Sequence, residues 1–162
     1  MVSHGARSTV HSETGLTVAE VAALADVVHA ENNLGATISS GSFETHGMII
    51  APCSIKTLSG IANSYDDNLV VRAADVALKE GRPLLLLVRE TPLHSGHLRL
   101  MTMASDHGAV IYPPVPAFYT QPQSVESIVD HTCRRALERI GFRSPATLRW
   151  AGLREGAVTT DA

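Results

Sequence analysis

The sequence predicts an α/β fold with a mostly parallel sheet. Short apolar runs alternate with segments of helical pattern, the order of elements that gives parallel strands joined by helices. One run, residues 84–88, is apolar without interruption, as expected of a strand covered on both faces. The chain of 162 residues is long enough for one domain with a substantial core.

Composition excludes several classes of protein. Hydrophobic residues make up 44% of the chain and charged residues 18%, as in folded globular proteins. The net charge of −3 argues against a nucleic-acid-binding protein. Cys53 and Cys133 form no CxxC pair, so neither a zinc site nor a disulfide framework is expected. We find no membrane-length apolar run and no signal peptide, and we expect a cytoplasmic protein.

The first part of the chain predicts little regular structure. Residues 1–5 have the pattern of the end of a strand. Thr17 and Glu20 have capping-box spacing and predict a helix whose apolar face continues to Val28. Residues 32–43 are rich in glycine, serine and asparagine and predict a loop.

Residues 48–60 predict a strand, a turn and a helix in direct succession. Met48 to Ala51 is an apolar run that Pro52 interrupts, and Ser54 is a suitable N-cap for the next helix. A helix N-terminus at a strand end presents free N–H groups and a positive dipole to a crevice, where anions bind well. An empty strand-to-helix connection has the same local pattern, so this stretch alone does not establish a site.

The rest of the chain continues the alternation. We expect residues 1–142 to form a single domain and residues 143–162 a C-terminal tail. The expected elements are a helix capped by the turn 65–68 and ending before Gly81, the strand 84–88, a helix from Thr91 and Pro92 to about Asp106, the strand 109–112, the proline-rich loop 113–122, and a helix capped by Ser124.

Polar clusters follow the predicted strands, where ligands bind in α/β folds. They are residues 54–57, the pair Arg89 and Glu90, and the loop ending at Tyr119. Glu90 directly follows a buried strand and could act as a general acid, although a structural ion pair explains it equally well. Tyr119 lies on a loop stiffened by prolines and could donate a hydrogen bond to an anion.

Other charged residues have simpler explanations. Arg72 and Lys79 lie two turns apart on one predicted helix face, which suits a solvated basic edge. His94 and His97 have a spacing that could bind a metal, but without a third ligand a surface or capping role is favoured.

Two neighbouring arginines follow on the last predicted helix. Arg134 and Arg135 diverge by about 100° around a helix, so both cannot face inward. Helical geometry does not choose between them.

Five longer motifs give the chain a specific resemblance to the flavin prenyltransferases of the UbiX family, in the order found there. The resemblance runs from about Val2 to Gly141. It implies an FMN-binding Rossmann-like or flavodoxin-like three-layer sandwich that forms a large homo-oligomer, often a dodecamer, with active sites at subunit interfaces. The motifs are Ser39-Ser-Gly-Ser-Phe43, Pro52-Cys-Ser-Ile-Lys-Thr-Leu-Ser-Gly60, Arg72-Ala-Ala-Asp-Val-Ala-Leu-Lys-Glu80, Val88-Arg-Glu-Thr-Pro-Leu-His94 and Pro113-Pro-Val-Pro-Ala-Phe-Tyr119.

The resemblance also implies an activity. The family transfers a dimethylallyl group from dimethylallyl phosphate to N5 and C6 of reduced FMN, without a metal, and the product serves UbiD-type decarboxylases. The chain would then act in ubiquinone-type biosynthesis or as the small subunit of a phenolic-acid decarboxylase system. A flavin-dependent aromatic-acid decarboxylase is a second possibility, against which the phosphate-site residues argue. A non-catalytic FMN-binding subunit is the third.

Single residues receive roles from the same resemblance. Glu90 matches the acid that helps the phosphate leave, and Glu13 matches a glutamate near the reacting centre. The phosphate of the donor is assigned to Lys79, Tyr119 and Arg135, with Arg72 nearby, which chooses Arg135 over Arg134. The flavin-contacting residues implied by the family are Ser3, Ser54, Ile55, Lys56, Thr57 and Arg89.

One departure concerns the N-terminus. Family members begin with a strand and a Gly-Ala-Ser-Gly-Ala loop that cradles the FMN phosphate, whereas this chain starts roughly where the second strand ends. The resemblance therefore implies a truncated domain that lacks the first strand and helix. Because the later motifs are intact, we expect a fragment or a mis-started reading frame rather than a degenerate paralogue.

Overall fold

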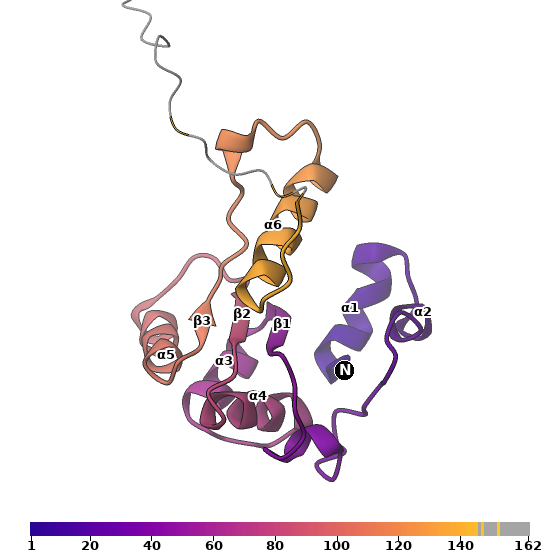
Figure 1. Ribbon diagram of the computed structural model, residues 1–162, viewed down its shortest axis with the longest axis vertical. Coiled ribbons are helices and arrows are strands. Elements are labelled where there is room, and N and C mark those ends of the chain that lie inside the picture. Colours follow the sequence, from indigo (N-terminus) through magenta and orange to yellow (C-terminus); the bar gives the residue numbers. More distant parts are fainter. Residues whose placement is uncertain (146, 148–151, 153–162) are drawn as a thin grey trace, which may run out of the picture. The chain divides into compact units, whose positions relative to one another are not determined.

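The computed structural model describes residues 1–145, 147 and 152. The chain divides into two compact units, Met1–Pro113 and Pro114–Ala162. Each unit is described by itself below, and the elements of both are labelled in Figure 1. Most of the expected C-terminal tail, residues 146, 148–151 and 153–162, lies outside the described residues.

A parallel sheet forms the centre of the first unit. Its strands are β1 (Met48–Cys53), β2 (Leu84–Val88) and β3 (Val110–Ile111), in the order β1-β2-β3 (Figure 1). All five residues of β2 are buried, which confirms the expectation of a central strand covered on both faces. The predicted α/β class with parallel strands is correct.

Strand β1 continues beyond the point where the sequence predicted its end. Pro52 was expected to cut the strand, but β1 runs on to Cys53, with a register irregularity between Ile50 and Cys53. Proline has no N–H to donate, and it is tolerated on an edge strand or at a bulge. Pro52 meets both conditions, because β1 is an edge strand of the described sheet and Pro52 lies within the register irregularity.

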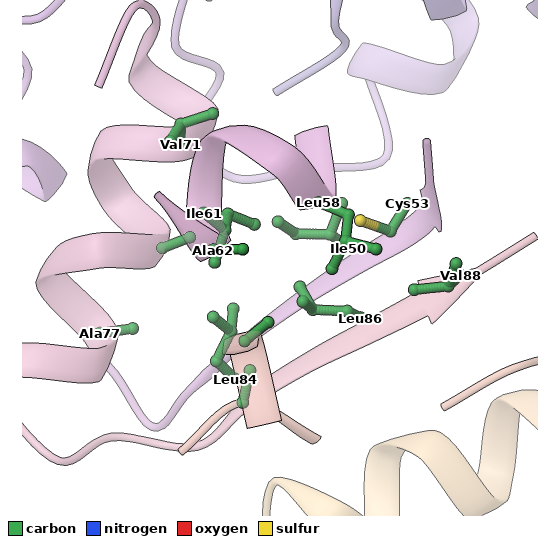
Figure 2. Close-up of a cluster of buried hydrophobic side chains, with 13 residues drawn as sticks. Ile50, Cys53, Leu58, Ile61, Ala62, Val71, Ala77, Leu84, Leu86 and Val88 are labelled. Atoms are coloured by element: carbon green, nitrogen blue, oxygen red, sulfur yellow. The ribbon is translucent and has the colours of Figure 1, made fainter. Parts of the chain in front are cut away.

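Two well-capped helices cover this sheet. In α3 (Ile55–Ala62) the side chain of Ser54 accepts a hydrogen bond from the Thr57 N–H, as its position in the sequence predicts. In α4 (Leu69–Lys79) Asn68 caps the first turn. Figure 2 shows how Leu58 and Ile61 of α3 meet Leu84 and Leu86 of β2 in the buried cluster. This core fixes the end of β1 and the start of α3, where the candidate site lies.

Helix α5 (Ser95–Asp106) begins later than predicted. Its N-cap is His94, whose Nδ1 accepts a hydrogen bond from the Gly96 N–H at 3.0 Å. Thr91 was expected to be the N-cap, and that prediction is wrong because the His94 imidazole satisfies the first turn instead. The predicted end of the helix at Asp106 is correct.

The N-terminal region contains more helix than the sequence indicated. Residues 1–5 were expected to end a strand, but Ser3 caps helix α1 (His4–Thr14). The predicted capping box of Thr17 is present in α2 (Val18–Ala22), which stops well before Val28. A 3-10 turn, η1 (Thr37–Ser39), follows in the predicted loop. Helix α1 buries no side chain, so its sequence has no apolar pattern that would predict a helix.

The second unit contains η2 (Phe118–Thr120) and α6 (Val125–Arg139). Ser124 caps α6 in a reciprocal pair with Ser127, which confirms the predicted N-cap. Among the described residues, no helix is both long and apolar enough to span a membrane.

Burial makes the Cys53 thiol unreactive. Its side chain lies in the core with no exposed surface, and burial raises the pKa of the thiol to about 12. Because the thiolate is the nucleophile, we expect Cys53 to resist iodoacetamide at pH 8 in the native protein and to react after unfolding. Peptide mass spectrometry would measure the modification, and rapid labelling of Cys53 in native protein would contradict the structure.

Candidate functional site

Two helix N-termini border one cleft in the first unit. The cleft has a volume of about 720 Å³ and is lined by Ser3 and His4 from the start of α1 and by Ser54, Lys56 and Thr57 from the start of α3. The first-turn N–H groups of a helix have no partner within the helix, and its dipole favours negative charge there. The cleft therefore suits an anionic group.

The turn at the start of α3 is held in place by its own hydroxyls. Ser54 Oγ accepts a hydrogen bond from the Thr57 N–H at 3.2 Å and donates one to Thr57 Oγ1 at 3.1 Å. Lys56, on the same turn, has a largely exposed side chain 4.0 Å from Asp67. An ion pair this exposed is weak, so the ammonium group can turn toward a ligand.

A carboxylate already lies at the start of α1. Glu31 lines the cleft, and its Oε2 accepts a hydrogen bond from the His4 N–H. The Glu31 carbonyl accepts a second hydrogen bond from the Leu69 N–H at 2.7 Å, which fixes the backbone. The N-terminus of α1 thus attracts an anion in the structure itself.

These observations fit the phosphate end of FMN. The cleft has the size of a small-molecule site, and it offers hydroxyls, an ammonium group and the N-terminus of α3, while Glu31 occupies the N-terminus of α1. Four of the six predicted flavin residues lie around it: Ser3, Ser54, Lys56 and Thr57.

The other two predicted flavin residues lie elsewhere. Ile55 packs against the core and is not among the cleft-lining residues. Arg89 lies just beyond β2, with its Nη2 3.9 Å from Glu13 Oε1. The structure thus brings together two residues far apart in the sequence, Glu13, which the resemblance placed near the reacting centre, and Arg89, which it gave as a flavin contact. Both side chains are more than half exposed, so this pair is weak and easily rearranged.

The predicted phosphate cations of the first unit are engaged in ion pairs. Arg72 lies 3.0 Å from Asp66 and 3.6 Å from Asp75. Lys79 donates a hydrogen bond to Glu80 at 2.6 Å and lowers the pKa of that carboxyl group. Arg72 and Lys79 do not converge on a common described partner.

Both cations nevertheless border the Ser39–Phe43 motif. Arg72 Nε donates to the Ser39 carbonyl at 3.2 Å, and Arg82 donates to the Gly41 and Phe43 carbonyls. A Cβ on Gly41 would collide with the Glu80 carboxylate and would lie 2.8 Å from Lys79 Nζ. Glycine therefore allows this loop to approach the Lys79 ammonium group closely.

Glu90 follows Arg89 at the carboxyl end of β2 and is exposed. No ion pair joins it to another residue of the described part of the chain. The neighbouring Arg89 pairs with Glu13 instead.

The second unit places Tyr119 and Arg135 near one face of α6. The ring of Tyr119 contacts that of His131 edge-on, with centroids 6.3 Å apart. His131 and Arg135 lie one helical turn apart on α6, so they share a face. Arg135 donates to Glu138, whereas Arg134 pairs with Asp130. The hydroxyl and guanidinium that the resemblance assigns to the donor phosphate thus occupy one small unit.

The histidine pair of α5 has a structural role. His94 is the N-cap and stacks on His97, with ring centroids 3.6 Å apart, which confirms the favoured capping role. No group of three or more His, Cys, Asp or Glu side chains in the described part of the chain could hold a metal ion.

The family described as Flavoprotein matches residues 2–137. The chain belongs to the flavoprotein family. Within it, the chain is 57% identical over 154 residues to the flavin prenyltransferase UbiX of Escherichia coli strain K12, a match covering 94% of this chain and 82% of that protein. The expected resemblance to UbiX-like flavin prenyltransferases is confirmed.

Solved structures of related proteins have the same fold as this chain. A crystal structure of AnUbiX (PadA1) in complex with FMN and dimethylallyl pyrophosphate superposes with a TM-score of 0.90 at 46% identity, over 93% of this chain and 80% of that one. A dodecameric FMN-dependent UbiX-like decarboxylase from Escherichia coli O157:H7 superposes with a TM-score of 0.89 at 50% identity, over 93% and 81%. These likenesses confirm the predicted flavoprotein fold.

Sequence reasoning missed three residues of these sites. Glu31 lies just before the predicted loop 32–43, outside any predicted element, and its hydrogen bond to α1 and its place in the cleft lining reveal it. His131 and Glu138 lie one turn before and one turn after Arg135, and this helical spacing could have indicated both.

The Ser54 hydroxyl gives a test of the cleft. Replacing Ser54 by alanine removes the α3 cap and is expected to lower the free energy of unfolding by about 1 kcal/mol. It should also weaken FMN binding, measured by quenching of flavin fluorescence. The matched control is Ser124→Ala, which removes the equivalent cap of α6 and should leave FMN affinity unchanged. Equal FMN affinity in both variants would contradict the site.

Proposed function

We propose that this chain is a flavin prenyltransferase that transfers a dimethylallyl group from a dimethylallyl phosphate to reduced FMN. The observation that carries the proposal is the cleft at the start of α1 and α3, which gathers Ser3, Ser54, Lys56 and Thr57 in a chain of this family. The bound FMN and dimethylallyl pyrophosphate of the related AnUbiX structure support the same pair of reactants.

The residues divide into two tasks in this proposal. The first turn of α3 binds the flavin phosphate through N–H groups and hydroxyls, and Ser3 adds a hydroxyl from the start of α1. Tyr119 and Arg135 bind the phosphate of the donor, and Lys79 adds a cation after its pair with Glu80 opens. Reduced FMN supplies the nucleophilic atoms N5 and C6.

Glu90 is the proposed acid. Breaking the allylic C–O bond leaves negative charge on the phosphate, and a proton from a carboxyl group stabilises the leaving group. Cations on the phosphate oxygens stabilise the same charge. Glu13 and Arg89, joined at the end of β2, are proposed to position the flavin ring and the reacting atoms.

The recipient of the product, the cellular compartment and the assembly of the enzyme are part of the same proposal. The product would serve a UbiD-type decarboxylase, the protein would act in the cytoplasm, and its subunits would form a homo-oligomer, for which the dodecameric relative is the precedent.

A single incubation tests the function. The purified protein is mixed anaerobically with reduced FMN and dimethylallyl phosphate, with the pyrophosphate as a parallel donor, and the flavin is analysed by mass spectrometry. A flavin heavier by one prenyl unit supports the proposal. Bound but unchanged FMN would overturn it and leave a flavin-dependent decarboxylase or a non-catalytic FMN-binding subunit.

A flavin-dependent decarboxylase is the second candidate, favoured by the description of the Escherichia coli O157:H7 relative. Incubation of the FMN-loaded protein with an aromatic acid and no prenyl donor separates the two. Release of carbon dioxide under these conditions would support the decarboxylase.

A further inference from the structure

The two neighbouring arginines of α6 have carboxylate partners that differ in burial. Arg134 Nε donates to Asp130 at 2.6 Å, and the Asp130 side chain is 58% exposed. Arg135 Nη1 donates to Glu138, whose side chain is only 7% exposed. One arginine therefore contacts a solvated acid, and the other contacts a covered one.

A covered carboxylate restrains its cation. Removing a carboxylate from water costs free energy that a nearby cation must offset, so Arg135 is held close to Glu138. The Arg135 side chain itself is 40% exposed. Its guanidinium thus extends from a covered anchor to solvent.

The anchored guanidinium keeps donors for a ligand. Arginine has five N–H donors in one rigid plane, and the hydrogen bond to Glu138 uses Nη1. The hydrogen bond restricts the movement of the plane, and with it the directions that the remaining donors can take. Tyr119 lies beside His131, one turn earlier on the same helix face, so a hydroxyl donor is close to this face.

We propose that Glu138 is the positioning residue for Arg135 and fixes its guanidinium in the orientation that binds the phosphate of the prenyl donor. This rests on the proposed function, in which Arg135 binds that phosphate. Glu138 does not touch the phosphate, because two anions in contact repel each other. It acts by reducing the side-chain freedom that Arg135 loses when the donor binds.

Two roles of Glu138 predict opposite changes in phosphate affinity when its charge is removed. If Glu138 only neutralised Arg135, its removal would leave a freer cation and tighten phosphate binding. If Glu138 positions Arg135, its removal weakens phosphate binding.

The test compares Glu138→Gln with Asp130→Asn. Glutamine keeps the shape of the side chain and removes its charge. We expect the KM for dimethylallyl phosphate to rise about tenfold, the effect of about one charge-assisted hydrogen bond, with kcat nearly unchanged. Asp130→Asn breaks the equivalent exposed pair of Arg134 and should leave KM unchanged. Glu138→Asp keeps the charge and should recover part of the affinity.

A double-mutant cycle separates positioning from a general effect on folding. In an Arg135→Gln background, Glu138→Gln should have no further effect on KM. An unchanged or lowered KM in Glu138→Gln, or the same rise in both backgrounds, would overturn the proposal. Calorimetric titration with inorganic phosphate gives the same comparison without turnover. If the unaltered protein makes no prenylated flavin, the proposed function fails, while the phosphate titration still decides the role of Glu138.

Discussion

Glutamine in place of Glu90 is expected to leave FMN bound and to lower turnover by a factor of about 10² to 10⁴, the range for loss of a general acid. The side chain lies beyond β2 and is not among the residues that line the cleft, so flavin affinity should not depend on its charge. An amide of the same shape can donate a hydrogen bond but cannot transfer a proton to the departing phosphate. Single-turnover kinetics with reduced FMN would measure the loss.

Two comparisons make this result specific to Glu90. Asp106→Asn makes the same acid-to-amide change at the exposed end of α5 and should leave turnover unchanged. A dimethylallyl donor whose leaving group is a weaker base needs less proton donation, so the Glu90→Gln loss should shrink with it. Unchanged turnover with dimethylallyl phosphate would remove Glu90 from the acid role.

The parts of the fold that the sequence predicted correctly are those with dense apolar pattern or strong caps. The uninterrupted run Leu84–Val88 is β2, and Ser54 and Ser124 begin helices as expected. Helix α1 was missed because it buries no side chain and therefore has no amphipathic signal. Its two local signals are the Ser3 cap and Gly15 at φ 73°, which together could have predicted it.

In the candidate site, too, local features could be predicted from the sequence and long-range contacts could not. Local pattern predicted the helix start at Ser54, because caps depend on neighbouring residues, but it did not establish an anion site there. The pair of Arg89 and Glu13 could not be predicted from pattern, since it joins distant parts of the chain. Helical angle left Arg134 and Arg135 equivalent, and their different carboxylates depend on burial, which a sequence alone does not give.

Some sequence expectations stay predictions. The single domain over residues 1–142 with a tail from residue 143 is one of them. The catalytic roles of Glu90, Glu13 and Lys79 are others, and Glu90→Gln tests the first of these roles.

Alanine in place of Leu86 is expected to destabilise the protein by about 2–5 kcal/mol, the range for large-to-small changes in a core. Leu86 has no exposed surface and lies in the central strand, paired with Ile50 of β1 and Ile111 of β3. It also belongs to the buried cluster with Leu58 and Ile61 of α3 (Figure 2). The cavity would therefore open beneath the helix whose N-terminus borders the flavin cleft.

The measurement is urea denaturation followed by circular dichroism, at one fixed protein concentration because assembly stabilises folded subunits. Leu24→Ala is the matched control, since Leu24 is 84% exposed and surface changes usually alter stability by less than about 0.5 kcal/mol. We expect FMN affinity to fall in Leu86→Ala, because the Ser54 turn depends on the packing of α3. Equal stability of the two variants would show that this cluster is not the core that supports the site.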